Sequence, residues 1–341
     1  MGTRMATLYI TEQGSILRKT GDRIIVEKDD QTLLEVPCHK VDAVLIFGAV
    51  QVTIQALSEL LEHGIELALF TRHGRLKGQL TPIKSKNIVL RMAQFERARD
   101  PVFVLQTARA VVGAKIGNAM TVLRRFAYNH PERKAVLDAE IMRLDAHLAG
   151  IDRVPDLNSL NGLEGIAGRA YFAGLAQMIL ADLAFPGRRR RPAPDPINAL
   201  LSFGYTLIGN ELHSLLDGMG FDPYLGFLHQ IDYGRPSLAL DLLEEFRHPL
   251  VDRLMLTLIN KGILKEADFA LDPASGSMYL TPEAMKVYFR HFERWMLEER
   301  IDSPDGQKLG FRRAFQLQAH RMADAIRDGK VYQPFRYGDQ D

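Results

Sequence analysis

The feature that most constrains the fold is a change of hydrophobic period near Pro82. Before it, short runs rich in β-branched residues, such as TLYIT and DRIIVEKD, are divided by turn signals such as Gly21-Asp22, which is typical of strands. From about Asn87 to the end, apolar residues recur at helical spacing. The sequence therefore predicts an α+β protein, with a small N-terminal β domain followed by a large all-α domain.

The expected boundaries follow from this change. Residues 1–82 are predicted to form a sandwich-like sheet with one helix, IQALSELLEHG, which Thr53 can cap and after which Gly64 is well placed. Residues 83–86 are expected to be a linker, and residues 87–341 an α-helical catalytic domain. A hairpin in DPASGSMYLT is the one β signal that we expect in the second domain.

Composition limits the class of protein. The chain has 341 residues, of which 46% are hydrophobic and 25% charged, as in ordinary globular proteins. It has neither the ~20 uninterrupted apolar residues of a membrane span nor the apolar core of a signal peptide. Its single cysteine, Cys38, excludes an internal disulfide and a metal cluster built on cysteines. We expect a cytoplasmic protein that does not enter a membrane.

Charge is distributed unevenly along the chain. Residues 72–134 contain 14 Lys and Arg against 3 Asp and Glu, an excess of +11, although the whole chain has a net charge of only +1. The stretch FPGRRRRPAPDP, residues 185–196, is predicted to be an arginine-rich loop. Both features indicate a polyanionic partner. They are equally compatible with solvated helix faces and a solvated linker.

Two isolated residues are candidates for chemistry. The chain has no Walker loop, no G-x-S-x-G and no H-E-x-x-H motif. Glu164 lies in NGLEGIAGRAYF, where a carboxylate is costly to desolvate unless it is paired or bound to a metal; the alternative is a helix-N-terminal acid stabilised by the helix dipole. His229, in PYLGFLHQIDYGRPS, is by itself more typical of a core or surface histidine than of a ligand.

A third candidate is the segment 238–248, LALDLLEEFRH. Its leucines recur at helical spacing, and Ser237 can cap the helix. Its acids and His248, with Asp252 one turn further on, are predicted on the opposite, solvated face: Asp241, Glu244, Glu245, His248 and Asp252. Because the first turn is apolar all round, Asp241 and Glu244 emerge beside a buried segment, and their i, i+3 spacing would let them share one cation. A set of Glu, His and Glu suits Mn²⁺ or Mg²⁺ better than structural zinc.

Four sequence blocks together carry a family resemblance: SLNGLEGIAGRAYF, DPINALLSFGYTLIGNEL, PYLGFLHQ and GRPSLALDLLEEFRHPLVDRL. In this order they resemble the CRISPR-associated endonuclease and integrase that inserts new spacers into CRISPR arrays. ELALFTRHGRLKGQL and KNIVLRMAQF extend the resemblance upstream over nearly the whole chain. The sequence looks most like the type I-C branch.

The resemblance implies a metal site formed by Glu164, His229 and Glu244, which would hold Mn²⁺ or Mg²⁺; many relatives have Asp in place of Glu244. Asp241 matches a nearby acid that supports catalysis. Asn198 and Tyr205 match polar residues near the active centre. Glu245 and His248 match no ligand, so we expect them to face solvent or form ion pairs.

The implied reaction is phosphoryl transfer on DNA, in which the 3′-OH of a captured fragment attacks a phosphodiester of the CRISPR repeat; with water as nucleophile the same site would cleave DNA. The implied partners are double-stranded DNA (spacer precursor and repeat), a second copy of the chain bound through the β domain, a small ferredoxin-like nuclease and an accessory end-processing nuclease. The basic residues that we expect to contact DNA are Arg91, Lys115, Arg169, Arg188, Arg189, Arg190, Arg191, Arg235 and Arg247.

Two other functions stay open at this level. The protein would be a non-catalytic DNA-binding scaffold if Asp241 and Glu244 were only a solvated face. It would be a metal-dependent hydrolase of a small phosphoester if turnover did not need the positively charged residues of the stretch 72–134.

Overall fold

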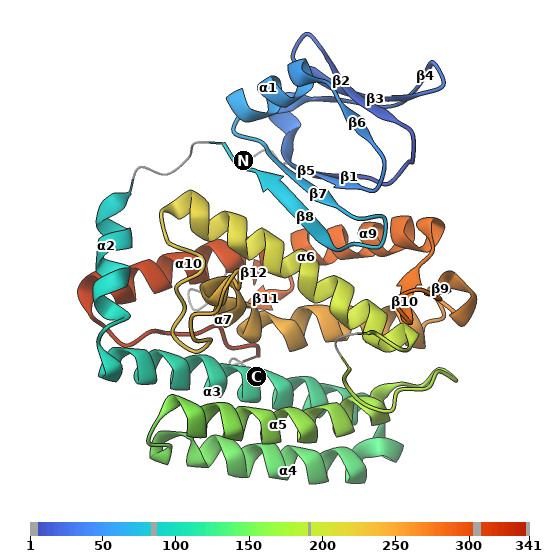
Figure 1. Cartoon of the computed structure of the whole chain (residues 1–341). Coiled ribbons are helices and arrows are strands. Elements are labelled where there is room, and N and C mark those ends of the chain that lie inside the picture. Colours follow the sequence, from blue (N-terminus) through green and yellow to red (C-terminus); the bar gives the residue numbers. More distant parts are fainter. Residues whose placement is uncertain (1–5, 83–86, 190–191, 303–307, 339–341) are drawn as a thin grey trace. The chain divides into compact units, whose positions relative to one another are not determined.

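The computed structural model describes residues 6–82, 87–189, 192–302 and 308–338. The expected linker 83–86, together with Arg190 and Arg191, lies outside the described residues. The chain divides into two compact units, one formed by residues 1–85 with 285–289 and the other by the rest of the chain. The first unit contains β sheets and the second is mainly helical, so the expected α+β class is confirmed (Figure 1).

The N-terminal unit contains two four-stranded sheets. One has the order β1-β5-β7-β8, and the other has the order β4-β3-β2-β6. Helix α1 follows β6, and a 3₁₀ turn, η1, connects β4 to β5. The element bounds are β1 Ala6–Ile10, β2 Ile16–Thr20, β3 Arg23–Lys28, β4 Gln31–Pro37, η1 Cys38–Lys40, β5 Val41–Phe47, β6 Gln51–Val52, α1 Ile54–Glu62, β7 Glu66–Phe70 and β8 Leu76–Leu80.

Local signals predict part of this unit well. Strands β2, β3 and β4 pair antiparallel in sequence order, as their turn signals indicate. The Thr53 hydroxyl accepts the backbone N–H of Ala56 at the start of α1, and Gly64 has a φ of +72° just after its end, so both expected caps are confirmed. In contrast, β1, β5 and β7 pair in parallel. Hairpin spacing did not predict these pairs, because strands far apart in the chain leave no local turn signal.

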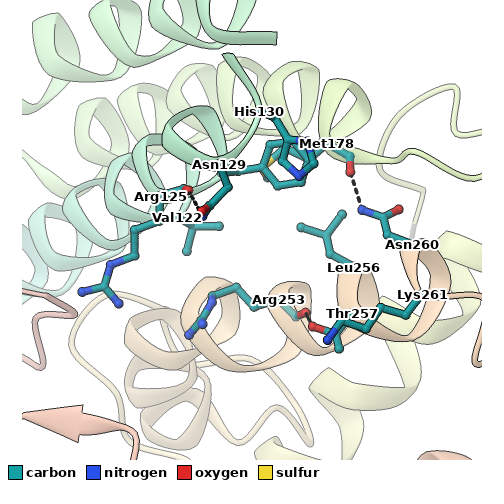
Figure 2. A pocket seen from close by; sticks show the side chains of 11 residues that line it. Val122, Arg125, Asn129, His130, Met178, Arg253, Leu256, Thr257, Asn260 and Lys261 are labelled. Atoms are coloured by element: carbon teal, nitrogen blue, oxygen red, sulfur yellow. Dashed lines mark hydrogen bonds between the residues drawn. The ribbon is translucent and has the colours of Figure 1, made fainter. Parts of the chain in front are cut away.

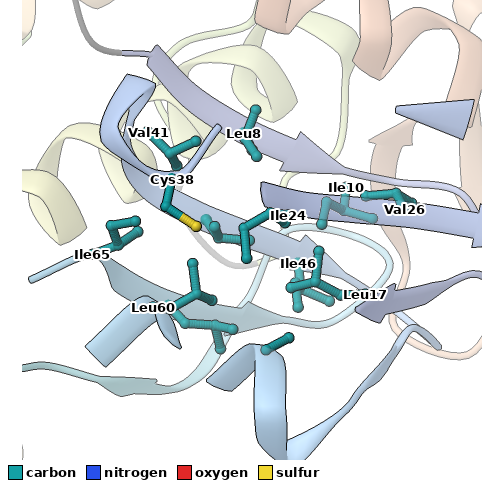
Figure 3. Packing of buried hydrophobic residues seen from close by; sticks show 13 residues of the cluster. Leu8, Ile10, Leu17, Ile24, Val26, Cys38, Val41, Ile46, Leu60 and Ile65 are labelled. Atoms are coloured by element: carbon teal, nitrogen blue, oxygen red, sulfur yellow. The ribbon is translucent and has the colours of Figure 1, made fainter. Parts of the chain in front are cut away.

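One hydrophobic cluster joins the two sheets to α1 (Figure 3). It includes Leu17 and Ile24 from one sheet, Val44 from the other and Leu60 from α1. Cys38 belongs to the same cluster and is 1% exposed. Burial of apolar side chains from every layer is the main stabilising term of such a unit.

The second unit consists mainly of helices. Their bounds are α2 Ile88–Arg97, α3 Pro101–Asn129, α4 Lys134–Gly150, α5 Leu157–Met178, α6 Pro196–Met219, α7 Ser237–Phe246, α8 Arg253–Asn260, α9 Pro282–Leu297 and α10 Phe311–Asp328. Residues 285–289 of α9 are counted with the first unit. Short 3₁₀ turns are η2 Pro131–Arg133, η3 Ile151–Arg153 and η5 Glu266–Asp268, and a π-helical segment, η4, spans Arg247–Asp252. The strand pairs are β9 Phe269–Asp272 with β10 Ser277–Leu280, the expected hairpin, and β11 Ile301–Asp302 with β12 Lys308–Leu309.

Two helix ends differ from the expected ones. Helix α5 ends at Met178, although apolar periodicity continues to residue 184. There the Asn260 side chain donates to the Met178 carbonyl and accepts the N–H of Leu180, so a distant residue completes the helix end. At the start of α7, Ser237 is not a cap: it is buried, and its hydroxyl donates to the Gln230 carbonyl.

Helix α7 is buried on all sides, and the expected solvated face is wrong. Glu245 and Asp252 are fully buried, and His248 is 2% exposed. In Figure 1 the helix lies in the interior of the unit, in contact with α3 and α6. The C-terminal segment 331–337 covers its remaining side, since the Tyr332 hydroxyl and the Phe335 N–H both donate to the Glu245 carboxylate. Periodicity alone assigns polar residues to solvent and does not register such a covering segment.

Glu164 is the eighth residue of α5 and therefore lies beyond its first turn. This excludes the helix-N-terminal interpretation of that acid, because the dipole effect falls off within the first turn. None of the helices in the described part of the chain has the length and apolar character that a membrane crossing requires.

Candidate active site

Glu164 and Glu244 meet at a shared ammonium group. Glu164 comes from α5 and Glu244 from α7, and Lys115 reaches both from α3. Lys115 Nζ lies 2.6 Å from Glu244 Oε2 and forms an ion pair with Glu164 Oε1. The side chains of Lys115 and Glu244 are only 7% and 6% exposed, whereas that of Glu164 is 28% exposed. Two carboxylates from distant segments thus already share one cation at the edge of the helical core.

Arg247 provides a second positive charge. Its Nη1 lies 3.0 Å and 2.8 Å from the two carboxylate oxygens of Glu244, and its guanidinium group lies over the ring of Tyr205, 4.4 Å from the centroid. Burial opposes ionisation of Glu244, but Arg247 and Lys115 outweigh it and hold the pKa of that carboxyl well below its usual range. Glu244 is therefore an ionised, acceptor-only group, as a metal ligand must be.

Asp241 orients His229. Its Oδ1 lies 2.8 Å from His229 Nδ1 and also accepts the backbone N–H of His229, while Oδ2 accepts the N–H groups of Phe227 and Leu228. Because a carboxylate can only accept, Nδ1 carries the proton and Nε2 keeps its lone pair. This is the arrangement in which an acid supports a metal-binding histidine. Gly226 makes it possible, since a Cβ at that position would lie 2.7 Å from Asp241 Oδ2.

A buried network on Asp252 adjoins these groups. Tyr205, Tyr171 and His248 all hydrogen-bond to the Asp252 carboxylate. Burial, with the negative charge of Asp252, raises the pKa of both tyrosines, so both hydroxyls stay protonated and donate. Burial likewise lowers the pKa of His248. Because Tyr205 also contacts Arg247, this network fixes the guanidinium group that faces Glu244.

Asn198 lies at the start of α6, where its backbone N–H and its Nδ2 donate to the Asp195 carboxylate. Its Oδ1 accepts from Arg188 Nη1 and from the Arg189 N–H, and its Nδ2 donates to the Gly187 carbonyl. Asn198 therefore shapes the arginine loop. Arg188 connects that loop to Tyr205, over whose ring its guanidinium lies at 5.4 Å.

The candidate ligands do not converge fully. His229 is close enough to Glu244 for an electrostatic interaction between them. Within the described ranges, however, one donor atom from each of three His, Cys, Asp or Glu residues lies within 4.8 Å of the others only at Cys38, Glu59 and His63. Lys115 and Arg247 pair with the carboxylates of Glu164 and Glu244, whereas His229 pairs with Asp241. Glu164, His229 and Glu244 therefore do not form a group of donor atoms as compact as that one.

The basic residues that the sequence singled out have different environments. Lys115 and Arg247 are buried and ion-paired with the acids rather than presented on a surface. Arg91 and Arg235 donate to the backbone carbonyls of Phe221 and Gln230. Arg169 and Arg189 are exposed, and Arg188 is half-buried.

A separate basic cavity lies between the C-terminal parts of α3 and α5 and helix α8 (Figure 2). Its volume is about 520 Å³, a size typical of ligand sites. Arg125, His130, Arg253 and Lys261 contribute nitrogen groups, and its eleven lining residues, all within the described part of the chain, include no acid. In Figure 2 the side chains of Arg125 and Arg253 extend to the same end of the cavity.

Sequence reasoning missed Tyr171 and assigned Lys115 to DNA and Asp252 to a solvated face. Asp252 and Tyr171 form the buried network, and Lys115 joins the two acids. One local signal existed, because His248 and Asp252 are spaced i, i+4 in an otherwise apolar helical segment. The partner of Lys115 had no signal, since Glu164 lies 49 residues away.

Comparison with known proteins identifies the family. The family model for CRISPR associated protein Cas1 matches residues 8–294. The chain is 37% identical to a CRISPR-associated endonuclease Cas1 of Chlorobaculum tepidum over 98% of this chain and 99% of the relative. The chain therefore belongs to the Cas1 family.

Solved structures share the fold. A chain of a Cas6-RT-Cas1–Cas2 complex superposes with a TM-score of 0.82 at 26% identity, covering all of this chain and 37% of that longer one. A casposase bound to its integration product superposes with a TM-score of 0.86 over 99% of this chain and 95% of the casposase chain. Its identity of 20% supports a common fold and no more.

Proposed function

We propose that the protein is a metal-dependent DNA endonuclease and integrase that inserts new spacer DNA into a CRISPR array by attack of a 3′-OH on repeat phosphodiesters. The observation that carries the proposal is the ammonium of Lys115 between Glu164 and Glu244. Membership of the Cas1 family supports the same reaction.

Glu164, His229 and Glu244 would hold Mn²⁺ or Mg²⁺, and their oxygen and imidazole donors suit these ions. The residues fit such an ion, because the two acids already share a cation and Asp241 takes up His229 Nδ1, which leaves Nε2 as the nitrogen that a metal would bind. When bound, the ion would polarise a phosphodiester and stabilise negative charge on the phosphorane or the leaving 3′ oxygen.

The residues around the proposed ligands hold them in position and neutralise their negative charge. Asp241 holds the His229 ring, while Lys115 and Arg247 offset the two glutamates. With the carboxylates of Asp241 and Asp252, two cations face four anions, so a divalent cation would neutralise the site and let an anionic phosphate approach. The Tyr205–Asp252 network keeps Arg247 in place.

DNA would be held mainly through its backbone, which carries no sequence information. The exposed Arg169 and Arg189, the arginine loop as a whole and the basic cavity near Arg125 offer phosphate contacts. The other basic residues that we assign to DNA binding are Arg91, Arg188, Arg190, Arg191 and Arg235.

The proposed partners follow from the family. They are double-stranded DNA as spacer precursor and repeat, a second copy of the chain bound through the sandwich-like β domain of residues 1–82, and a small ferredoxin-like nuclease. The similar chain in a Cas1–Cas2 complex supports the last of these. We also propose an accessory end-processing nuclease, a type I-C-like system and a cytoplasmic location.

The experiment is strand transfer of a short duplex into a plasmid that carries the cognate array, with and without the partner nuclease, in Mn²⁺ and in EDTA. Glu164→Ala, His229→Ala and Glu244→Ala should abolish transfer, and Asp145→Ala, at an exposed acid of α4, should not. If all three variants still carried out strand transfer, the assignment of the active site to these residues would be wrong. DNA binding without any product would favour the scaffold. Turnover of a simple phosphodiester that survives charge reversal at Arg169 and Arg189 would favour the small-molecule hydrolase.

A further inference from the structure

Three potential metal ligands meet in the N-terminal unit, apart from the proposed active site. Cys38 begins the η1 turn between β4 and β5, while Glu59 lies on α1 and His63 follows its last residue. One donor atom from each side chain lies within 4.8 Å of the other two. Cys38 and Glu59 are buried, whereas His63 is exposed. The group therefore lies at the edge of the hydrophobic cluster, where solvent can reach it.

His63 and Glu59 are in direct contact. His63 Nδ1 lies 3.1 Å from the Glu59 carbonyl oxygen. Because that oxygen can only accept, Nδ1 carries the proton and Nε2 keeps its lone pair, which is the usual second contact of a metal-binding histidine. The Glu59 carboxylate uses Oε2 for its ion pair with Lys19, and Oε1 faces His63, 3.5 Å from Nδ1. One carboxylate oxygen is thus directed toward the group.

We propose that Cys38, Glu59 and His63 form a Zn²⁺ site, with water as the fourth ligand. Sulfur, imidazole and carboxylate donors in tetrahedral geometry are typical of zinc. A thiolate does not suit the hard ions Mg²⁺ and Mn²⁺, so this site is selective for a different metal from the one proposed at Glu164.

Zinc binding would change the protonation state of Cys38. Burial raises the pKa of the Cys38 thiol, so it is protonated at neutral pH without a metal. On binding, the S–H bond breaks, the sulfur–zinc bond forms, and the proton leaves to solvent. No electrons are transferred.

The expected consequence is structural. Cys38 follows β4 of one sheet and precedes β5 of the other, and α1 packs in the cluster that joins both sheets. A metal held by Cys38, Glu59 and His63 would tie the helix to the crossover between the sheets. Zinc would then stabilise the folded state by binding to it alone.

The test is titration of the full chain with Co²⁺ as a spectroscopic substitute for zinc. Because Cys38 is the only cysteine, a sulfur-to-cobalt charge-transfer band reports this site alone. We expect the band to appear with tetrahedral d–d absorption, to be displaced by Zn²⁺, and to be unchanged in Glu164→Ala. Its loss in Cys38→Ser is expected, and absence of the band from the unsubstituted protein would overturn the proposal.

A matched histidine pair keeps the test independent of folding. His63 and His39 are both exposed, and His39 adjoins Cys38 in the chain. His63→Ala should weaken Co²⁺ and Zn²⁺ binding by about 10-fold or more, and His39→Ala should leave it unchanged. Equal affinity in the two variants, or no gain in melting temperature with Zn²⁺, would also overturn the proposal. Neither readout depends on DNA strand transfer, so its outcome is separate from that of the proposed function.

Discussion

The imidazole Nδ1 of His229 lies 2.8 Å from Oδ1 of Asp241, and the same carboxylate accepts three backbone N–H groups from residues 227–229. Asp241 thus holds both the ring and the loop that carries it. This explains why a fully buried acid belongs to the candidate site without facing solvent.

Substitution Asp241→Asn tests this relationship. An amide of equal size cannot accept all four hydrogen bonds, so the His229 ring should lose its fixed tautomer. We expect Mn²⁺ affinity to fall about 10- to 100-fold, measured by calorimetry. Asp232→Asn, at an exposed acid of the same loop, is the control. Equal affinities in the two variants would show that Asp241 does not act through His229.

Gly226→Ala should displace Asp241 without touching any candidate ligand. The new Cβ would lie 2.7 Å from Asp241 Oδ2 and 2.7 Å from the backbone carbonyl carbon of Ser237. We expect a loss of about 1–3 kcal/mol in the free energy of unfolding, together with weaker Mn²⁺ binding. Gly162→Ala in α5, where no atom lies within 4 Å of the added Cβ, should keep Mn²⁺ affinity. A Gly226→Ala protein with normal affinity would contradict the positioning role.

Lys115→Met removes the cation that Glu164 and Glu244 share. Without a divalent ion, the buried Glu244 then relies on Arg247 alone, and we expect a loss of about 3–5 kcal/mol in the free energy of unfolding. Mn²⁺ should raise the melting temperature of the variant more than that of the unsubstituted protein, because the ion no longer competes with an ammonium. An identical Mn²⁺-induced shift in both proteins would refute this competition.

Asn198→Ala and Arg189→Gln should affect DNA binding in different ways. Asn198 shapes the arginine loop through Arg188, Arg189 and Gly187, so its loss should weaken affinity while the number of phosphate contacts stays the same. Arg189→Gln should remove one phosphate contact. The negative slope of log affinity against log salt concentration should then become less steep by about 0.9. Fluorescence anisotropy over a salt series distinguishes them, and the same slope change in both variants would contradict the assignment.

Glu245 should make stability depend on pH. Burial raises the pKa of this carboxyl to about 8 from an ordinary value of 4.5, despite hydrogen bonds from Tyr332 and Phe335. Between these values the folded state binds more protons than the unfolded state, so the free energy of unfolding falls as pH rises, by up to about 1.4 kcal/mol per pH unit. Glu245→Gln should flatten this dependence in urea denaturation series. If the free energy of unfolding changed with pH equally in both proteins, Glu245 would not be the source of the dependence.

Part of the candidate site was accessible from sequence because its residues lie in four blocks whose order resembles a known family. The pairing of Lys115 with the two glutamates was not accessible, nor was the Asp252 network, because their members are brought together only by packing of α3, α5, α7 and η4. From the sequence alone, a charged residue is interpreted as facing solvent or as contacting a polyanion. Its buried partner is visible only in three dimensions.

The sequence by itself determined the α+β class, the change from strands to helices after Pro82, the caps of α1 and the hairpin of β9 and β10. These are set by interactions within a few residues, which leave periodic and turn signals in the chain. Only the tertiary structure decided the parallel pairing of β1, β5 and β7, the burial of Glu245 and His248, and the cation shared by Glu164 and Glu244. Each of these depends on segments that are distant in sequence, and the free energy of burying a polar group is set by what finally packs against it.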